Sequence, residues 1–253
     1  MYLKNQKQRV KFGVNNKNYI QMIDKLEDLI NKGLAKDVFH AEMNLAVYQK
    51  ISDNIGFLKT TEPEDQTLFG YLQSSAEIQM VLAVSRLFDT YSYPTRCIGS
   101  LLEMIRKNKG SFPEIKDRPN TISCIRAYRP TDEIIDPLIE AISDVDSSVF
   151  PNRFYIFYSS EYLDLDEDIN SIRKLRDKSI SHNEAYDIKK MEDIEHSVVI
   201  RLLKFAKEII SVIGVAYLSI MFSGNGVYLL SADALQKSYF IDHLIEKMKK
   251  QKV

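Results

Sequence analysis

Apolar residues recur at the spacing of an amphipathic α-helix along nearly the whole chain, from Tyr19 to Met248. Glycines interrupt this pattern, for example Gly33 after the first segment and Gly110 after the fourth. The predicted helices cover residues 19–32, 38–51, 64–89, 98–107, 120–128, 131–145, 164–179, 188–222 and 232–249. The chain is therefore predicted to be all-α: a multi-helix bundle over residues 61–253, on which residues 1–60 pack as an N-terminal helical extension.

One segment departs from the helical pattern. Phe154 to Tyr158 is an apolar and aromatic run with the propensity of a β-strand, but no partner strand is predicted for it. We interpret it as a buried helix or as an extended connector. Either interpretation is compatible with an all-α fold.

The composition is that of a soluble globular protein, with 45% hydrophobic and 27% charged residues. A chain of 253 residues is long enough to bury a sizeable core. The 34 basic and 35 acidic residues give a formal net charge of −1. This near balance excludes a protein that coats nucleic acid through a global positive field, but it leaves room for a local basic patch.

No metal site, cofactor site or membrane span is predicted. Cys97 and Cys124 stand far apart, without a CxxC pair or clustered histidines, so two buried thiols in a reducing cytoplasm are expected. Residues 1–17 carry five basic residues but no continuous apolar stretch, which excludes a secretory signal. The uncharged run from Ile209 to Phe222 has 14 residues, whereas a membrane span needs about 20. It is predicted to be a buried core helix of a cytoplasmic protein.

The candidate chemistry lies in the run from Arg176 to His182, which reads RDKSISH. A guanidinium can clamp phosphate oxygens with its planar fork, and an imidazole can move a proton near neutral pH. Such a pair suits chemistry on a phosphodiester without a metal ion. Because four of the six residues 173–178 are basic, the alternative interpretation is a solvated helix face.

The geometry of this run depends on where its helix ends. On one continuous helix, Arg176 and His182 would lie about 120° apart in azimuth and about 9 Å apart along the axis. Ser179 and Ser181 favour helix ends over helix interiors. A helix that ends near Ser179 would let His182 turn back toward Arg176 or toward a symmetry-related copy.

The run from Arg176 to His182 resembles the signature of the HEPN superfamily of helical ribonuclease domains: an Arg, a polar residue, a short spacer and a His. More specifically, the sequence LRDK at residues 175–178 resembles the abortive-infection (AbiU-like) branch of that superfamily. That branch also carries an Arg-Leu-Phe-Asp element late in an earlier long helix, present here as residues 86–89. The similarity extends over about residues 65–249, although only these two motifs are specific.

The resemblance implies a metal-independent endoribonuclease without a cofactor. His182 would act as general base or acid, and Arg176 would stabilise the charge on the phosphoryl oxygens. Asp177 would orient one of these two residues, while Lys178 and Arg173 would hold flanking phosphates. The resemblance also implies RNA as substrate and a homodimer whose two motifs converge in one cleft. The biological role would be phage defence or a toxin–antitoxin-like system, with a possible neutralising partner protein.

The second motif is expected to support the site. Arg86 and Asp89 are three residues apart in the predicted helix, so they are expected to pair on one face and brace the site rather than act in catalysis. A second function remains open, that of a non-catalytic HEPN-like dimer that binds RNA, a nucleotide or a partner protein with the same pocket. The near-neutral net charge is compatible with this alternative.

Overall fold

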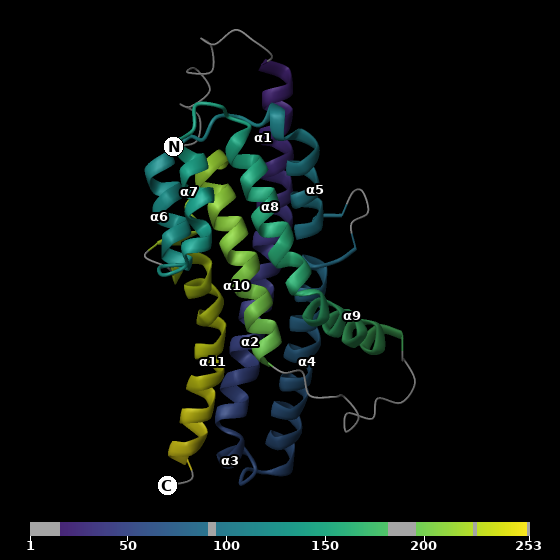
Figure 1. Ribbon diagram of the computed structural model, residues 1–253. Helices are drawn as coiled ribbons and strands as arrows, with labels where there is room; N and C mark the ends of the chain where they lie inside the picture. The colour runs from purple at the N-terminus through teal and green to yellow at the C-terminus, as the bar shows by residue number, and fades with distance from the viewer. Residues whose placement is uncertain (1–15, 91–94, 182–195, 225–226, 252–253) are drawn as a thin grey trace.

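The computed structural model describes residues 16–90, 95–181, 196–224 and 227–251, and these residues are almost wholly helical (Figure 1). The helices are α1 (Asn16–Leu29), α2 (Ala35–Asp53), α3 (Ile55–Leu58), α4 (Pro63–Leu87), α5 (Ile98–Asn108), α6 (Arg118–Tyr128), α7 (Asp136–Ser143), α8 (Val149–Asp164), α9 (Asp166–Ser181), α10 (His196–Ile213) and α11 (Leu229–Gln251). Two π-helical turns, η1 (Ile30–Leu34) and η5 (Gly214–Leu218), join α1 to α2 and extend α10. Short 3-10 turns are η2 (Lys109–Ser111) and η3 (Glu133–Ile135). The all-α prediction is confirmed.

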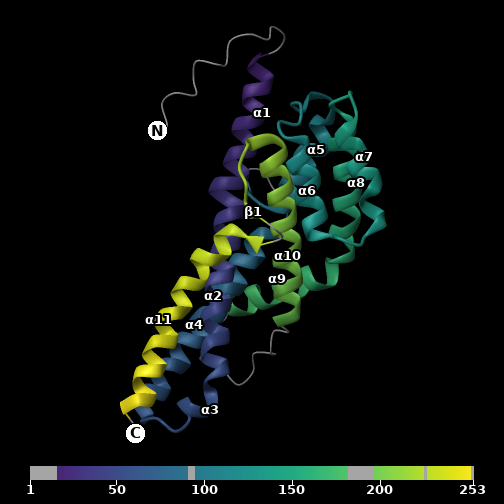
Figure 2. The ribbon, with the colours of Figure 1, turned by 90° about the vertical axis from the view of Figure 1, so that its left-hand side faces the viewer.

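The described residues contain one small sheet. Its strands, β1 (Ser223–Gly224) and β2 (Val227–Tyr228), pair antiparallel just before α11. This hairpin reverses the chain, so that α11 runs back beside α2 (Figure 2). The helix α2 also packs against α4, and these three long helices form the lower arm of the molecule in Figures 1 and 2.

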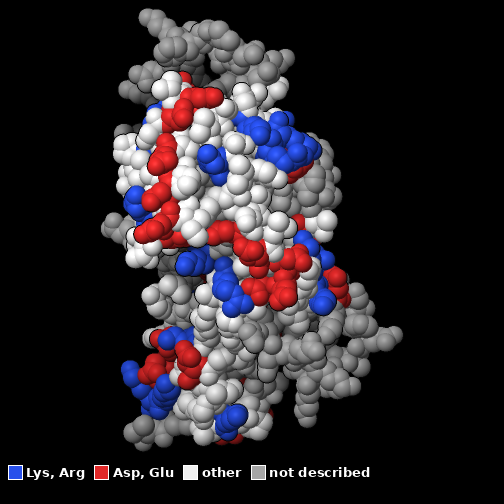
Figure 3. Space-filling view, in the orientation of Figure 1, with Lys and Arg blue, Asp and Glu red and all other residues white. Residues whose placement is uncertain are grey.

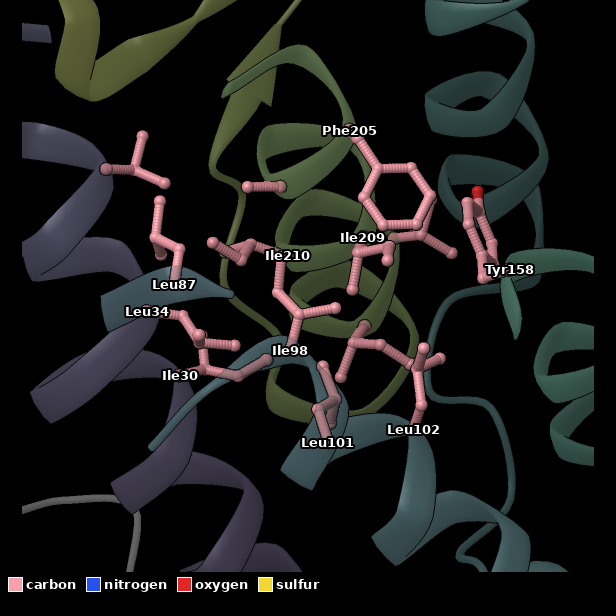
Figure 4. Close-up of a cluster of buried hydrophobic side chains, with 14 of the residues drawn as sticks. Ile30, Leu34, Leu87, Ile98, Leu101, Leu102, Tyr158, Phe205, Ile209 and Ile210 are labelled. Carbon is pink, nitrogen blue, oxygen red and sulfur yellow. The ribbon is translucent and has the colours of Figure 1, made fainter. Parts of the chain in front are cut away.

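The core is centred on α10, which is buried along most of its length. Figure 4 shows Ile209 and Ile210 of α10 pointing toward side chains of several other elements. The buried residues around them come from η1, α4, α5 and α8: Ile30, Leu34, Leu87, Ile98, Leu101, Leu102 and Tyr158. Residues of the predicted 1–60 extension and of the predicted 61–253 bundle thus contribute to the same hydrophobic core.

Several helix ends follow local signals that the sequence displays. Pro63 opens α4 and acidic residues fill its first turn, where a missing N–H costs nothing and negative charge is favoured. Asp117 caps α6 by accepting a hydrogen bond of 3.1 Å from the backbone N–H of Asn120. Asp132 caps the short η3 turn by accepting a hydrogen bond of 3.0 Å from the backbone N–H of Ile134, and α7 continues from that turn. Phe154 to Tyr158 lie inside α8, so the helical interpretation is right; Phe154 and Tyr158 are buried, whereas Ile156 is 51% exposed.

The predicted helix stop at Gly33 is wrong. The chain passes from α1 through η1 into α2 without leaving the helical conformation. Gly33 faces Arg96 so closely that a Cβ at position 33 would lie 2.5 Å from the Cβ of Arg96. Arg96 in turn donates hydrogen bonds of 2.9 and 3.2 Å to the carboxylate of Asp28. Glycine is therefore needed here for a close approach between segments and not for a helix end.

The predicted helix over residues 188–222 is shorter at its C-terminal end. Its helical part ends with η5 at Leu218, because Ser219 takes a left-handed conformation with φ of 57°. The predicted beginning at residues 188–195 lies outside the described residues. The apolar segment from Ile209 to Leu218 is helical and largely buried, as predicted.

Candidate functional site

Two short motifs that are far apart in the sequence meet where α9 lies beside the end of α4 (Figure 1). The helix α4 ends at Leu87, and Phe88 is its C-terminal cap residue. The Arg-Leu-Phe-Asp element therefore straddles the helix end. Side chains of α9 reach the last two residues of that element.

Arg176 of α9 is held by two carboxylates. Its Nη1 lies 3.2 Å from Oδ1 of Asp89, and its Nε lies 2.9 Å from Oδ1 of Asp177. The bond to Asp177 raises the pKa of Arg176; burial opposes this shift and the bond to Asp89 adds to it. The side chain is 25% exposed. Arg176 is thus a permanently charged, oriented guanidinium at the protein surface.

Arg173 of α9 contacts the same helix end. Its Nε and Nη2 both donate to the backbone carbonyl of Phe88, at 3.2 and 2.5 Å. The last carbonyls of a helix have no partner within that helix and carry partial negative charge, so a guanidinium there stabilises the end of α4. Arg173 was predicted to hold a flanking phosphate, but in this structure its donors are directed at this carbonyl.

The predicted pair between Arg86 and Asp89 is not formed. The helix α4 ends before Asp89, so the two side chains no longer share a helix face. Arg86 instead contacts Oδ1 of Asp37 in α2, with both its Nε and its Nη2 at 2.8 Å. Burial raises the pKa of Asp37, and the contact with Arg86 works against that shift. Of Arg86 and Asp89, only Asp89 is bonded to Arg176.

The histidine of the first motif, His182, lies outside the described residues, as does the side chain of Lys178. The helix α9 continues through Ser179 to Ser181, so the predicted helix end near Ser179 is two residues short. Ser181 lies five residues after Arg176, which is about 7.5 Å along a helix axis.

Sequence reasoning missed a network of charged side chains around Arg129, of which Glu208 is buried. Glu208 of α10 is only 1% exposed, and its Oε1 accepts hydrogen bonds from Arg129 Nε and the Tyr158 hydroxyl, at 2.6 and 2.8 Å. Arg129 also binds both carboxylate oxygens of Glu161. A usable signal existed: Glu208 is the one acidic residue in the apolar stretch from Phe205 to Phe222.

Cys97 and Cys124 are free and buried, as predicted. Burial raises the pKa of the Cys124 thiol, and its contact with Ser223 partly opposes this. Within the described ranges, no His, Cys, Asp and Glu side chains gather in groups of three or more suited to a metal ion. Nor is any helix in these ranges both long and apolar enough to cross a lipid bilayer.

Comparisons with protein-family models, with curated proteins and with solved structures find no match to this chain. Its function is therefore inferred from the two motifs and from the geometry of their contact.

Proposed function

We propose that this protein is a metal-independent endoribonuclease of the HEPN type. The observation that carries the proposal is the contact between the two motifs, in which Asp89 holds Arg176 and the neighbouring carbonyl of Phe88 binds Arg173. Two motifs that resemble one family's signature are thus in direct contact. A solvated helix face would not require a partner on another helix.

The reaction expected for such a site is an internal transfer at phosphorus. The 2′-hydroxyl oxygen of the RNA attacks the adjacent phosphorus while the bond from phosphorus to the 5′ oxygen breaks. His182 would take the proton from the 2′-hydroxyl or give one to the leaving 5′ oxygen. Arg176 would stabilise the negative charge that develops on the phosphoryl oxygens. The products are a 2′,3′-cyclic phosphate and a 5′-hydroxyl end.

A homodimer is part of the proposal, because one copy supplies only one Arg176 and one His182. In the dimer, two copies of α9 would face each other and form a cleft that grips RNA from both sides. RNA cleavage by such a dimer in a bacterial cell would stop growth. This outcome suits a role in phage defence or a toxin–antitoxin-like system, with a partner protein that neutralises the activity.

One observation favours the second candidate function, a non-catalytic dimer that binds RNA, a nucleotide or a partner protein. Arg176 already contacts two carboxylates, those of Asp89 and Asp177. A phosphate would have to compete with them for the guanidinium. A site that only binds tolerates such competition better than one that must stabilise a transition state.

The experiment that separates the two functions is an analysis of RNA ends. Purified protein is incubated with a 5′-labelled single-stranded RNA, with and without EDTA. The ribonuclease proposal predicts fragments with 2′,3′-cyclic phosphate ends in both conditions. Binding without any fragment would favour the second function, and cleavage that EDTA abolishes and magnesium restores would contradict the metal-independent mechanism.

A further inference from the structure

A pocket of about 460 Å³ opens beside the buried charges around Arg129. Residues that follow α6, the end of α8 and one side of α10 form its wall. Its volume is in the range of sites that hold small organic ligands. The proposed nuclease site is separate: Asp168, beside the pocket, precedes Arg176 by eight residues, about 12 Å along α9.

The charges at the base of this pocket do not balance. Arg129 is the only base in the network, and it contacts the carboxylates of Glu208, Glu161 and Asp132. Burial raises the pKa of Glu161; Arg129 opposes the shift, and the charges of Glu208 and Asp132 add to it. Three carboxylates around one guanidinium leave an excess of negative charge at a half-buried place.

The two oxygens of the Glu208 carboxylate are not equally hydrogen-bonded. Both hydrogen bonds to Glu208 are accepted by Oε1, and within the part of the chain that the structure describes no group donates to Oε2. Glu208 is 1% exposed and lines the pocket. In a side chain that is largely buried, a carboxylate oxygen is more stable when it accepts hydrogen bonds, so a ligand that carries N–H donors would suit Oε2.

The walls and the surroundings restrict the ligand further. Phe205, Leu165 and Tyr128 give the pocket apolar walls that suit a hydrocarbon chain. Two basic residues lie at the rim: Arg201 is bound through both side-chain oxygens of Asp168, and Lys204 is exposed. Residues 131–172 contain eleven acidic residues and a single basic one, Arg153. Figure 3 shows acidic side chains in a band that follows α7 and crosses toward α9. The four carboxylates that line the pocket outnumber its three basic side chains, and together with these acidic surroundings they favour a cation.

We propose that this pocket binds an organic cation, namely a guanidinium or primary ammonium group carried on a short apolar chain. The cationic head lies against Glu208 and Glu161, and the chain lies against Phe205 and Leu165. A free alkylamine or guanidine provides this chemistry, and so does the Arg or Lys side chain of a partner protein. The proposal is independent of the ribonuclease activity, because binding is measured without RNA.

Isothermal titration calorimetry on the full-length protein tests the charge requirement with probes of matched shape. Butylguanidinium is compared with butylurea, which has the same outline but no charge. The peptide acetyl-Gly-Arg-Gly-amide is compared with its citrulline analogue. At least one cationic probe should bind at least about 10-fold more tightly than its neutral analogue, because the charge-assisted hydrogen bonds are lost with the charge.

Tighter binding of the peptide identifies a partner protein as the source, and tighter binding of butylguanidinium identifies a free metabolite. Equal binding of charged and neutral probes, or no binding of either cation at millimolar concentration, overturns the proposal.

Two substitutions locate the site. Glu161→Gln should weaken cation binding by about 10-fold, whereas Glu140→Gln, an exposed residue of α7 with the same loss of charge, should change it by less than about 2-fold. Lys204→Glu should change the affinity for the cation in the opposite direction. Lys204 is an exposed pocket residue, and its replacement by an acid should tighten binding by about 5-fold. This gain cannot result from damage to the fold. Unchanged affinity in both Glu161→Gln and Lys204→Glu overturns the assignment to this pocket.

Discussion

Arg176 Nη1 lies 3.2 Å from Asp89 Oδ1, although 87 residues separate the two in the chain. The contact fixes α9 against the end of α4, and the bonds from Arg173 to the carbonyl of Phe88 form a second tether one turn of α9 away. The orientation of the candidate catalytic arginine thus depends on where α4 ends. A change at either helix is expected to alter the position of the guanidinium.

The contact between Asp89 and Arg176 should contribute little to stability. Both side chains are partly exposed, so a double-mutant cycle of Asp89→Ala and Arg176→Ala in urea unfolding is expected to give a coupling free energy of about 0.5–1 kcal/mol. Its proposed role is to orient the guanidinium of Arg176. Additive effects of the two substitutions would show that the pair does not interact in solution.

Arg129 should contribute far more to stability than the contact between Asp89 and Arg176. Arg129→Ala leaves the buried carboxylate of Glu208 without its cation, which is expected to lower the free energy of unfolding by about 3–5 kcal/mol. The matched control is Arg126→Ala, because Arg126 is half exposed and its contact with Asp136 is long, at 3.5 Å. The control should cost less than about 1 kcal/mol. Equal losses in urea unfolding would contradict the assigned role of the buried network.

Two glycine substitutions in helical segments should change the free energy of unfolding in opposite directions. Gly33→Ala places a methyl group against the stem of Arg96 and is expected to destabilise the protein by about 1–3 kcal/mol. Gly70 lies inside α4, and a Cβ there would meet no atom within 4 Å. Gly70→Ala should therefore stabilise the protein by up to about 1 kcal/mol through helix propensity. Thermal unfolding of the two variants measures both signs, and a stabilising Gly33→Ala would contradict the close approach.

Glu103 should make the stability of the protein depend on pH, in a direction set by its ion pairs with Arg106 and Lys107. The hydrogen bond from Arg106 lowers the pKa of Glu103 from 4.5 to about 2, with Lys107 adding to the effect and burial opposing it. A depressed carboxyl pKa stabilises the fold above pH 4.5, and this contribution is lost as the pH falls toward 2. Carboxyl-carbon NMR titration should show this low pKa, and Arg106→Gln should return it toward 4.5. A pKa near 4.5 in the unaltered protein would rule out the pair.

The helices could be predicted because most of them bury one apolar face. Apolar residues on such a face recur along the sequence with the period of an α-helix. Residues 154–158 were ambiguous because β-propensity measures how well a side chain packs, and here those aromatic residues pack in a helix. Gly33 was misinterpreted because the reason for it, the approach of Arg96, is a tertiary contact. Local patterns cannot reveal such a contact.

The two motifs were visible in the sequence, but their contact was predicted only in part. The expected partner of Asp89 was Arg86, because spacing within one helix is the only geometry a sequence displays directly. Because α4 ends at Leu87, Asp89 lies beyond the helix and accepts a hydrogen bond from Arg176 of α9. Arg86 donates to Asp37 of α2 instead. The network around Glu208 joins residues from three segments of the chain, so only the unusual position of Glu208 in an apolar stretch indicated it.

The proposed ribonuclease activity requires that Arg176 and His182 act together on RNA. The most direct measurement is the single-turnover rate of RNA cleavage by the unaltered protein and by the His182→Ala and Arg176→Ala variants, with circular dichroism as a check of folding. Each substitution is expected to lower the rate by about 10²-fold or more, because one removes the proton-transfer group and the other the charge opposite the phosphoryl oxygens. Cleavage at an undiminished rate by the folded His182→Ala protein would contradict the account.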